Sequence, residues 1–266
     1  MLKAPPIQKA TCRMSSLAIA LTAAGCIFGG TLFGIGIQNW LPGHHLNKDS
    51  HEIVKLGAGM IATLTALVLG LLVSSAKNTF DTLNEGLKQV GAKTIQLDRT
   101  LAQYGPAAQP LREQLRRGLA ASIESLWPEK PFSPEEQAKL RYTSRIETLQ
   151  NQLSELAPQT EIQRQSLAKA NQIATDISQA RWLLMEQSQN PLPVPLLVIL
   201  ICWLTVLFVS FGLFAPRNGT VIIVLFVCAC SVSAAIFLIL ELNRPMEGSL
   251  KVSSVPMRTA LTLLGR

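Results

Sequence analysis

The residues of this chain best suited to binding a metal ion are three histidines and two acids clustered between positions 44 and 52. They are His44, His45, Asp49, His51 and Glu52. Imidazole nitrogens and carboxylate oxygens are ligands for zinc and copper. Their spacing matches no dedicated metal motif, and a hydrated loop explains the cluster as well. We therefore expect no metal and no other cofactor, with metal binding by His44, His45 and His51 as the alternative.

Other chemistry-bearing patterns are missing from the sequence. No nucleophile has an evident base, no glycine-rich loop is suited to phosphate, and no Cys/His metal box occurs. Cys228 and Cys230 lie about 200° apart around a helix, which is the wrong geometry for chelation. Four of the five cysteines lie in apolar stretches and indicate no disulfide framework: Cys26, Cys202, Cys228 and Cys230. We expect a protein that is not an enzyme.

Four long blocks without a charged residue dominate the rest of the chain. They cover residues 16–37, 56–76, 194–215 and 219–240. A helix of about 20 residues crosses the roughly 30 Å hydrocarbon layer of a membrane, so each block predicts a transmembrane helix. The first block is too long for the core of a signal peptide. Lipoprotein processing at Cys26 is the other alternative, and an uncleaved span is the preferred interpretation.

The distribution of charge predicts the orientation of these spans. An even number of spans places both termini and the segment between spans two and three on one side. Ten basic residues near the span ends lie on that side and three on the other, which predicts that the ten-charge side is cytoplasmic. Residues 77–190 carry 14 basic and 13 acidic side chains, so the net charge of +7 reflects topology and we expect no nucleic-acid partner. We expect a multi-pass protein of the bacterial inner membrane.

The predicted organisation has five parts, with a helical cytoplasmic domain between spans two and three. They are a leader at 1–15, spans one and two at 16–76, the cytoplasmic domain at 77–190, spans three and four at 194–240, and a cytoplasmic tail at 241–266. The fold class is an all-α membrane protein.

Span two is predicted to continue into the cytoplasmic domain as one helix of about 50 residues. No proline occurs between Ile53 and Gly105, and Gly105-Pro106 ends the helix. Apolar residues recur at heptad spacing along its second half: Phe80, Leu83, Leu87, Val90, Thr94, Leu97, Leu101 and Tyr104. Further helices are expected at about 109–127, from Ser133 to Pro158, and from Thr160 to Asn190. The apolar faces either pack on each other within one chain or, at the first helix, also between subunits.

Small residues form a stripe on span two. It consists of Gly59, Thr63, Ala66, Gly70 and Ser74. Such a surface lets helix backbones approach closely. The alternatives are packing within one subunit, or a face that lines a pore on a central axis. Span one has two similar patterns, Gly25-x-x-x-Gly29 and Gly30-x-x-x-Gly34.

The spans contain no ionisable residue near the bilayer centre, which argues against a proton- or ion-coupled transporter. Glu241 lies at the cytoplasmic end of span four, with Arg244 three residues later. We expect these two to form an interfacial ion pair. The alternative is a charged ring at a pore mouth in an oligomer.

Two stretches resemble a bacterial membrane family of uncharacterised function described as bestrophin-like. One is His51-Glu52-Ile53-Val54 with ATLTALVLGLLVSSAKNTFD at 62–81, and the other is LILELNRPMEGSLKVSSVPMRTAL at 238–261. Bestrophins proper are pentameric anion channels whose second transmembrane helix lines a pore narrowed by apolar rings. The resemblance implies that the stripe on span two occupies the comparable face. This chain departs from bestrophins in having no aromatic residue at 56–76.

The resemblance and the residues together lead to one functional hypothesis and a rival. The hypothesis is an oligomeric channel in the lipid bilayer that passes small anions along an axis lined by span two. The rival is a non-conducting membrane scaffold or sensor that recruits a partner through its cytoplasmic helices.

Overall fold

The computed structural model describes residues 15–38, 40, 48–128, 146–188, 194–216, 218–245 and 250–265. These residues form helices and connecting segments, and no strand occurs among them, which confirms the predicted all-α class. The helices are α1 (Ser16–Ile37), α2 (Lys48–Tyr104), η2 (Pro106–Ala108), α3 (Gln109–Leu126), α5 (Ile146–Ser154), α6 (Glu161–Ser188), α7 (Val194–Phe214), α8 (Gly219–Leu242) and α9 (Val255–Leu263).

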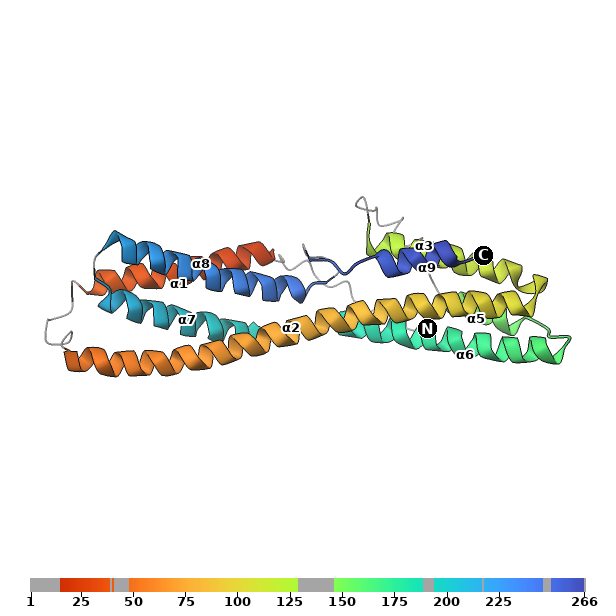
Figure 1. The fold of residues 1–266 in the computed structure, drawn as a ribbon, viewed down its shortest axis with the longest axis horizontal. Coiled ribbons are helices and arrows are strands. Elements are labelled where there is room, and N and C mark those ends of the chain that lie inside the picture. Colours follow the sequence, from red (N-terminus) through yellow and green to blue (C-terminus); the bar gives the residue numbers. More distant parts are fainter. Residues whose placement is uncertain are drawn as a thin grey trace, which may run out of the picture. The chain divides into compact units, whose positions relative to one another are not determined.

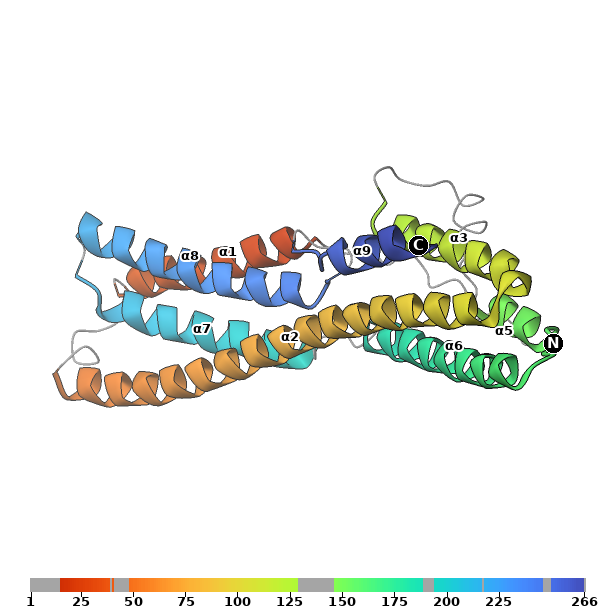
Figure 2. The same ribbon diagram turned by 45° about the vertical axis from the view of Figure 1, so that its right-hand side comes forward.

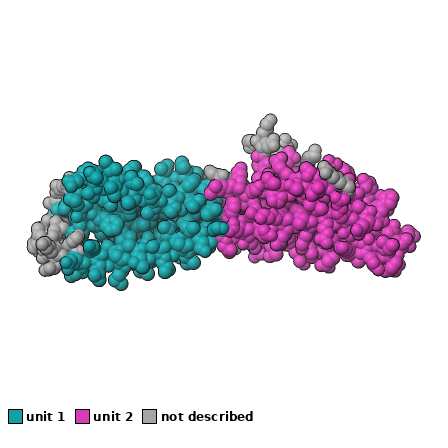
Figure 3. Space-filling model, in the orientation of Figure 1, with its two compact units in different colours: residues 1–77, 191–243 teal, residues 78–190, 244–266 magenta. Residues whose placement is uncertain are grey.

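The chain forms two compact units (Figure 3). The first comprises residues 1–77 and 191–243, and the second comprises residues 78–190 and 244–266. Among the described residues, four helices are long and apolar enough to cross a membrane, which confirms the four predicted spans: α1, α2, α7 and α8. The predicted boundaries of 16–37, 194–215 and 219–240 agree with the helix ends to within two residues.

Helix α2 is a single helix of 57 residues (Figure 1). It begins at Lys48, eight residues before the predicted apolar block, and ends at Tyr104 as predicted. Gly105 follows with φ = 111°, a backbone conformation that side chains with a Cβ rarely adopt. The helix therefore stops where glycine and the following proline prevent its continuation.

In the first unit, α1 packs against α7 and α8. Its core consists of apolar side chains from these helices and from α2, among them Ile27, Leu72, Leu200 and Ile236. Glycines allow the closest approach. At Gly34 and Gly212 an added Cβ would overlap backbone atoms of the facing helix, those of Val209 and Thr31 respectively. The Gly30-x-x-x-Gly34 pattern thus packs α1 on α7, while Gly25 and Gly29 face open space within this chain.

In the second unit, α2, α3, α5, α6 and α9 share one apolar core. The predicted heptad positions of α2 from Leu83 to Tyr104 are buried in the chain itself, so their packing is intramolecular. The alternative was that these positions also make contacts between subunits, which would require exposed side chains. Residues 129–145 lie outside the described residues, and with them the predicted helix start at Ser133. The predicted helix start at Thr160 is confirmed, because Thr160 and Gln163 form a capping box in which Gln163 N–H donates to Thr160 Oγ1 at 3.2 Å and Thr160 N–H donates to Gln163 Oε1 at 3.3 Å.

Helix α9 was not predicted from the sequence. It lies in the segment expected to be a cytoplasmic tail, and Met257 and Ala260 are buried in the second unit's core. Upstream, the Trp127 Nε1–H donates to the Val252 carbonyl oxygen at 2.8 Å. The C-terminal residues are therefore an integral part of this unit.

Candidate pore-lining face

The candidate site is the exposed face of α2 within the first unit. All five residues of the predicted stripe are exposed: Gly59, Thr63, Ala66, Gly70 and Ser74. At Gly59 and Gly70 an added Cβ would meet no heavy atom within 4 Å. The stripe therefore takes no part in packing within the chain.

The opposite face of α2 packs on the helices of its own unit. Thr65, Leu72 and Ala76 are buried there, and Leu72 is only 3% exposed. These residues recur at about seven and then four positions, as one side of a helix requires. Only the other side of α2, which includes the stripe, is left for another molecule, lipid or water.

Two different surfaces lie side by side on the exposed side of α2. Next to the stripe runs a row of large apolar residues that are also exposed. It comprises Ile53, Leu56, Met60, Leu64, Leu67 and Leu71. The row and the stripe are offset by about one residue, or 100° around the helix. Large apolar residues suit lipid or a neighbouring helix, whereas the small residues leave room beside the backbone.

The polar groups of the stripe are hydroxyls. The Thr63 hydroxyl donates to the Gly59 carbonyl oxygen at 2.9 Å. A hydroxyl bonded within its own helix keeps its oxygen lone pairs available and carries no charge. The stripe can contact water or a weakly held ion, but it has no group for covalent or acid–base chemistry.

Lysines bound the stripe at both ends. Lys55 precedes Gly59 by four residues and Lys77 follows Ser74 by three, and both side chains are exposed. Each spacing is about one turn, so both lysines continue the same face of α2. The sequence analysis missed them, although extending the helical phase by one turn at each end identifies them.

The predicted ion pair of Glu241 and Arg244 joins residues of two different units. Glu241 is 5% exposed at the C-terminal end of α8 in the first unit. Arg244 is half-buried and belongs to the second unit. The ion pair between them remains a prediction.

The histidine and acid cluster that gave metal binding as an alternative lies partly outside the described residues. His44 and His45 are outside them, and His51 belongs to the first turn of α2. In the described part of the chain, no three His, Cys, Asp or Glu residues are grouped so as to hold a metal ion. Metal binding by the three histidines remains untested.

Comparison with known proteins relates the chain to a family and to solved structures. A family model described as a Bestrophin-like domain matches residues 25–257. Two crystal structures of single-residue variants of a bacterial bestrophin homologue from Klebsiella pneumoniae resemble its fold. One has 15% identity, a TM-score of 0.69, and coverage of 95% of this chain and 99% of the other. The second has 14% identity, a TM-score of 0.65, and coverage of 93% and 100%. No curated protein matches the chain.

Proposed function

Because the chain belongs to the Bestrophin-like family, we propose that it forms a homo-oligomeric channel that conducts small anions across the bacterial inner membrane. In this proposal α2 from each copy contributes its stripe, Gly59 to Ser74, to a central axis. The observation that carries it is the exposure of that stripe, whose glycines have open space where a side chain would be.

The two surfaces on the exposed side of α2 support assembly around an axis. A row of large apolar residues beside the stripe gives the neighbouring helix or lipid an apolar contact surface. The stripe itself is small and uncharged. Copies arranged with the large residues in contact and the small residues toward the axis would leave a narrow passage lined by Thr63 and Ser74 hydroxyls.

The charges at the ends of the stripe support a preference for anions. Lys55 and Lys77 are 22 residues apart, about 33 Å at 1.5 Å per residue. That length matches the hydrocarbon layer of about 30 Å. Glu52 and Asp81 follow on the same face one turn further out at each end. In an oligomer the charge nearest each end of the stripe is therefore positive, which favours an anion within the passage, and the carboxylates lie one turn outside it.

The charge distribution also supports an orientation with the second unit and both termini in the cytoplasm. Basic residues near the span ends favour that side by ten to three. The segment 77–190 is nearly neutral, which does not suit a nucleic-acid partner.

Two measurements test this function. The mass of the purified protein in detergent should correspond to several chains, and liposomes containing it should pass Cl⁻. The substitution Thr63→Phe adds a ring on the axis and should strongly reduce the flux. Ile223→Phe is the control, because Ile223 is 64% exposed on α8. A monomeric protein, or a well-folded oligomer that passes no ion, would contradict the channel and favour the scaffold.

A further inference from the structure

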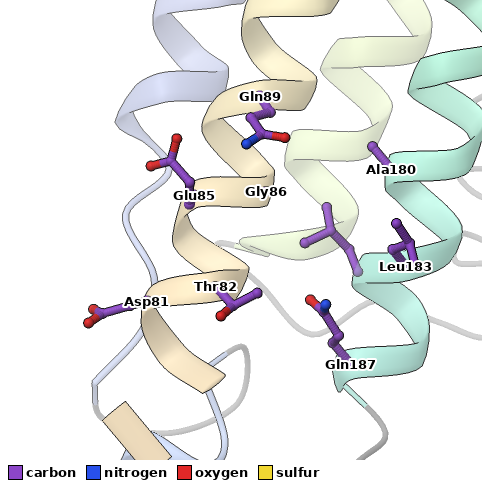
Figure 4. A pocket seen from close by; sticks show the side chains of 9 residues that line it. Asp81, Thr82, Glu85, Gly86, Gln89, Ala180, Leu183 and Gln187 are labelled. Atoms are coloured by element: carbon purple, nitrogen blue, oxygen red, sulfur yellow. The ribbon is translucent and has the colours of Figure 1, made fainter. Parts of the chain in front are cut away.

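A pocket between α2 and α6 lies within the second unit, outside the candidate pore-lining face (Figure 4). Its volume is about 400 Å³. Its α2 wall is polar and acidic, with Asp81, Glu85 and Gln89, and its α6 wall is largely apolar, with Leu183, Leu184 and Gln187. We call it the α2–α6 pocket.

An exposed apolar side chain lies in the α6 wall of the α2–α6 pocket. Leu183 lines the pocket and is 56% exposed, whereas Trp182 lies about 160° around α6 from Leu184, on the opposite side of the helix. A large apolar residue exposed in a pocket is typical of protein contact sites. The acidic wall adds a second requirement, since a complementary partner must bring positive charge.

Side-chain contacts show which residues of α6 lie beside which residues of α2. Gly86 faces Leu184, whose Cδ2 would lie 2.5 Å from an added Cβ. Seven residues later, Lys93 Nζ lies 2.9 Å from Asp176 Oδ2. The two helices are therefore antiparallel, and α6 packs on the side of α2 that contains residues 86 and 93.

The C-terminal segment packs on a different side of α2. Gly91 faces Met257, whose sulfur would lie 3.7 Å from an added Cβ. The Gly265 N–H donates to Asp98 Oδ2 at 3.2 Å. Residues 91 and 98 lie about 140° around the helix from residues 86 and 93. Figure 2 shows the result, with α9 and α6 on different sides of α2.

The segment that precedes α9, residues 250–254, lies at the same level along α2 as the α2–α6 pocket. Because α9 runs parallel to α2, the residues that precede Met257 come level with α2 residues before Gly91. Val252 is 2% exposed and its carbonyl accepts the Trp127 hydrogen bond, which fixes the segment. Three neighbouring side chains point to solvent and form what we call the C-terminal edge: Leu250, Lys251 and Val255.

We propose that the C-terminal edge of one copy of this chain docks into the α2–α6 pocket of the next copy. This inference rests on the proposed oligomer. In a ring around an axis parallel to α2, neighbouring copies contact each other at the same position along that axis. The α2–α6 pocket and the C-terminal edge lie at the same level along α2, so they can meet between neighbouring copies. Each chain has the pocket on one side of α2 and the edge on another, as a head-to-tail interface that closes a ring requires.

The chemistry of the two surfaces is complementary. The Lys251 ammonium of one copy meets the Glu85 carboxylate of the next. Leu250 and Val255, which are 42% and 64% exposed in the isolated chain, bury their side chains against Leu183 and Leu184 of the pocket wall. Glu85 already lies 3.6 Å from Lys88 within its own chain, but both are exposed and such a pair contributes little.

Cross-linking between copies tests the proposal in the full-length protein in membranes. Gln89→Cys and Val255→Cys are each introduced into a chain whose five native cysteines are replaced by alanine, expressed together in the same cells and treated with a short bis-maleimide. We expect a covalent dimer that neither single variant gives alone. The matched control pairs Val255→Cys with Gln103→Cys, which is exposed on nearly the same face of α2 but about 21 Å further along it. That pair should give no dimer.

A charge exchange provides the second arm. Lys251→Glu should reduce the fraction of oligomer, and adding Glu85→Lys in the same chain should restore it. An oligomer that forms without the Gln89–Val255 cross-link, or equal cross-linking of the control pair, overturns this docking but leaves the channel intact. A wild-type protein that is monomeric overturns the channel itself.

Discussion

Arg112 holds the carboxylate of Asp98 with two hydrogen bonds. Arg112 Nε donates to Oδ1 at 2.8 Å and Nη2 to Oδ2 at 3.0 Å. The Asp98 side chain is 1% exposed and that of Arg112 is 13% exposed. Because Gly265 N–H donates to the same carboxylate, this one group joins α2, α3 and the C-terminus. The Asp98 carboxylate thereby holds α3 and the C-terminal segment against α2 in the second unit.

Removing the Asp98 charge should destabilise the second unit. Asp98→Asn leaves the largely buried Arg112 guanidinium without a counter-charge, and breaking a buried pair in this way typically costs about 3 kcal/mol. Thermal unfolding followed by circular dichroism in detergent measures the loss. Glu113→Gln is the control, because Glu113 is exposed and 3.9 Å from Arg117, and its loss should change stability by less than about 0.5 kcal/mol. Equal stability of both variants would contradict the role assigned to Asp98.

The same pair predicts a dependence on acid. Burial raises the pKa of Asp98, but the hydrogen bonds from Arg112 and Gly265 and the charges of Arg112 and Arg99 outweigh it and hold the pKa below its ordinary value of 3.8. A depressed pKa stabilises the fold fully above the ordinary value and progressively less as pH falls through the folded value. The stability difference between wild type and Asp98→Asn should therefore be constant from pH 5 to 7 and shrink below about pH 4. A difference that grows toward acid would contradict this sign.

Close packing of α1 on α7 predicts different outcomes for two glycines of the same helix. Gly34→Ala forces a methyl group into the Val209 backbone, and overpacking of this kind typically costs about 1–3 kcal/mol. Gly25→Ala adds the same methyl where nothing lies within 4 Å, so its cost should be near zero. Thermal stability in detergent compares them. If Gly34→Ala is as stable as Gly25→Ala, the α1–α7 packing described here is wrong.

The lysine at the inner end of the stripe should influence which ions pass. A unit charge about 8 Å from an ion in a wet pore mouth changes its energy by about 0.5 kcal/mol. Lys77→Glu reverses the charge, which raises the energy of Cl⁻ and lowers that of K⁺ by about 1 kcal/mol each, and should lower Cl⁻ flux relative to K⁺ by roughly thirtyfold per copy. Reversal potentials in asymmetric KCl measure the ratio. Arg116→Glu, at an exposed position of α3, makes the same charge change away from the proposed axis and should leave the ratio unaltered.

The spans and the length of α2 were predictable because their causes are local in the sequence. A charge-free block of about 21 residues needs no knowledge of its partners to be identified as a span. The end of α2 at Gly105 and the capping box of Thr160 and Gln163 follow from neighbouring residues alone. The stripe on α2 could also be identified from the sequence, because its small residues recur with the period of a helix.

The remaining features depend on partners distant in the sequence. Helix α9 has nine residues and buries only Met257 and Ala260, so its apolar pattern is too short to distinguish from a tail. Gly212 matters only because Thr31 of α1 lies against it. Asp98 and Arg112 are 14 residues apart on two helices, and no local pattern indicates that they meet. The pairing of Asp98 with Arg112 could therefore be identified only from the three-dimensional structure.

The most direct test of the channel is whether a charged reagent that reacts at residue 63 stops the current. Thr63→Cys is placed in the full-length protein in liposomes, and a negatively charged thiosulfonate is added while Cl⁻ flux is followed. With the five native cysteines replaced by alanine, we predict that flux falls steeply in Thr63→Cys, while the cysteine-free parent and Ile223→Cys, exposed on α8, are unaffected. Undiminished flux from Thr63→Cys whose thiol has fully reacted would contradict an axis lined by α2.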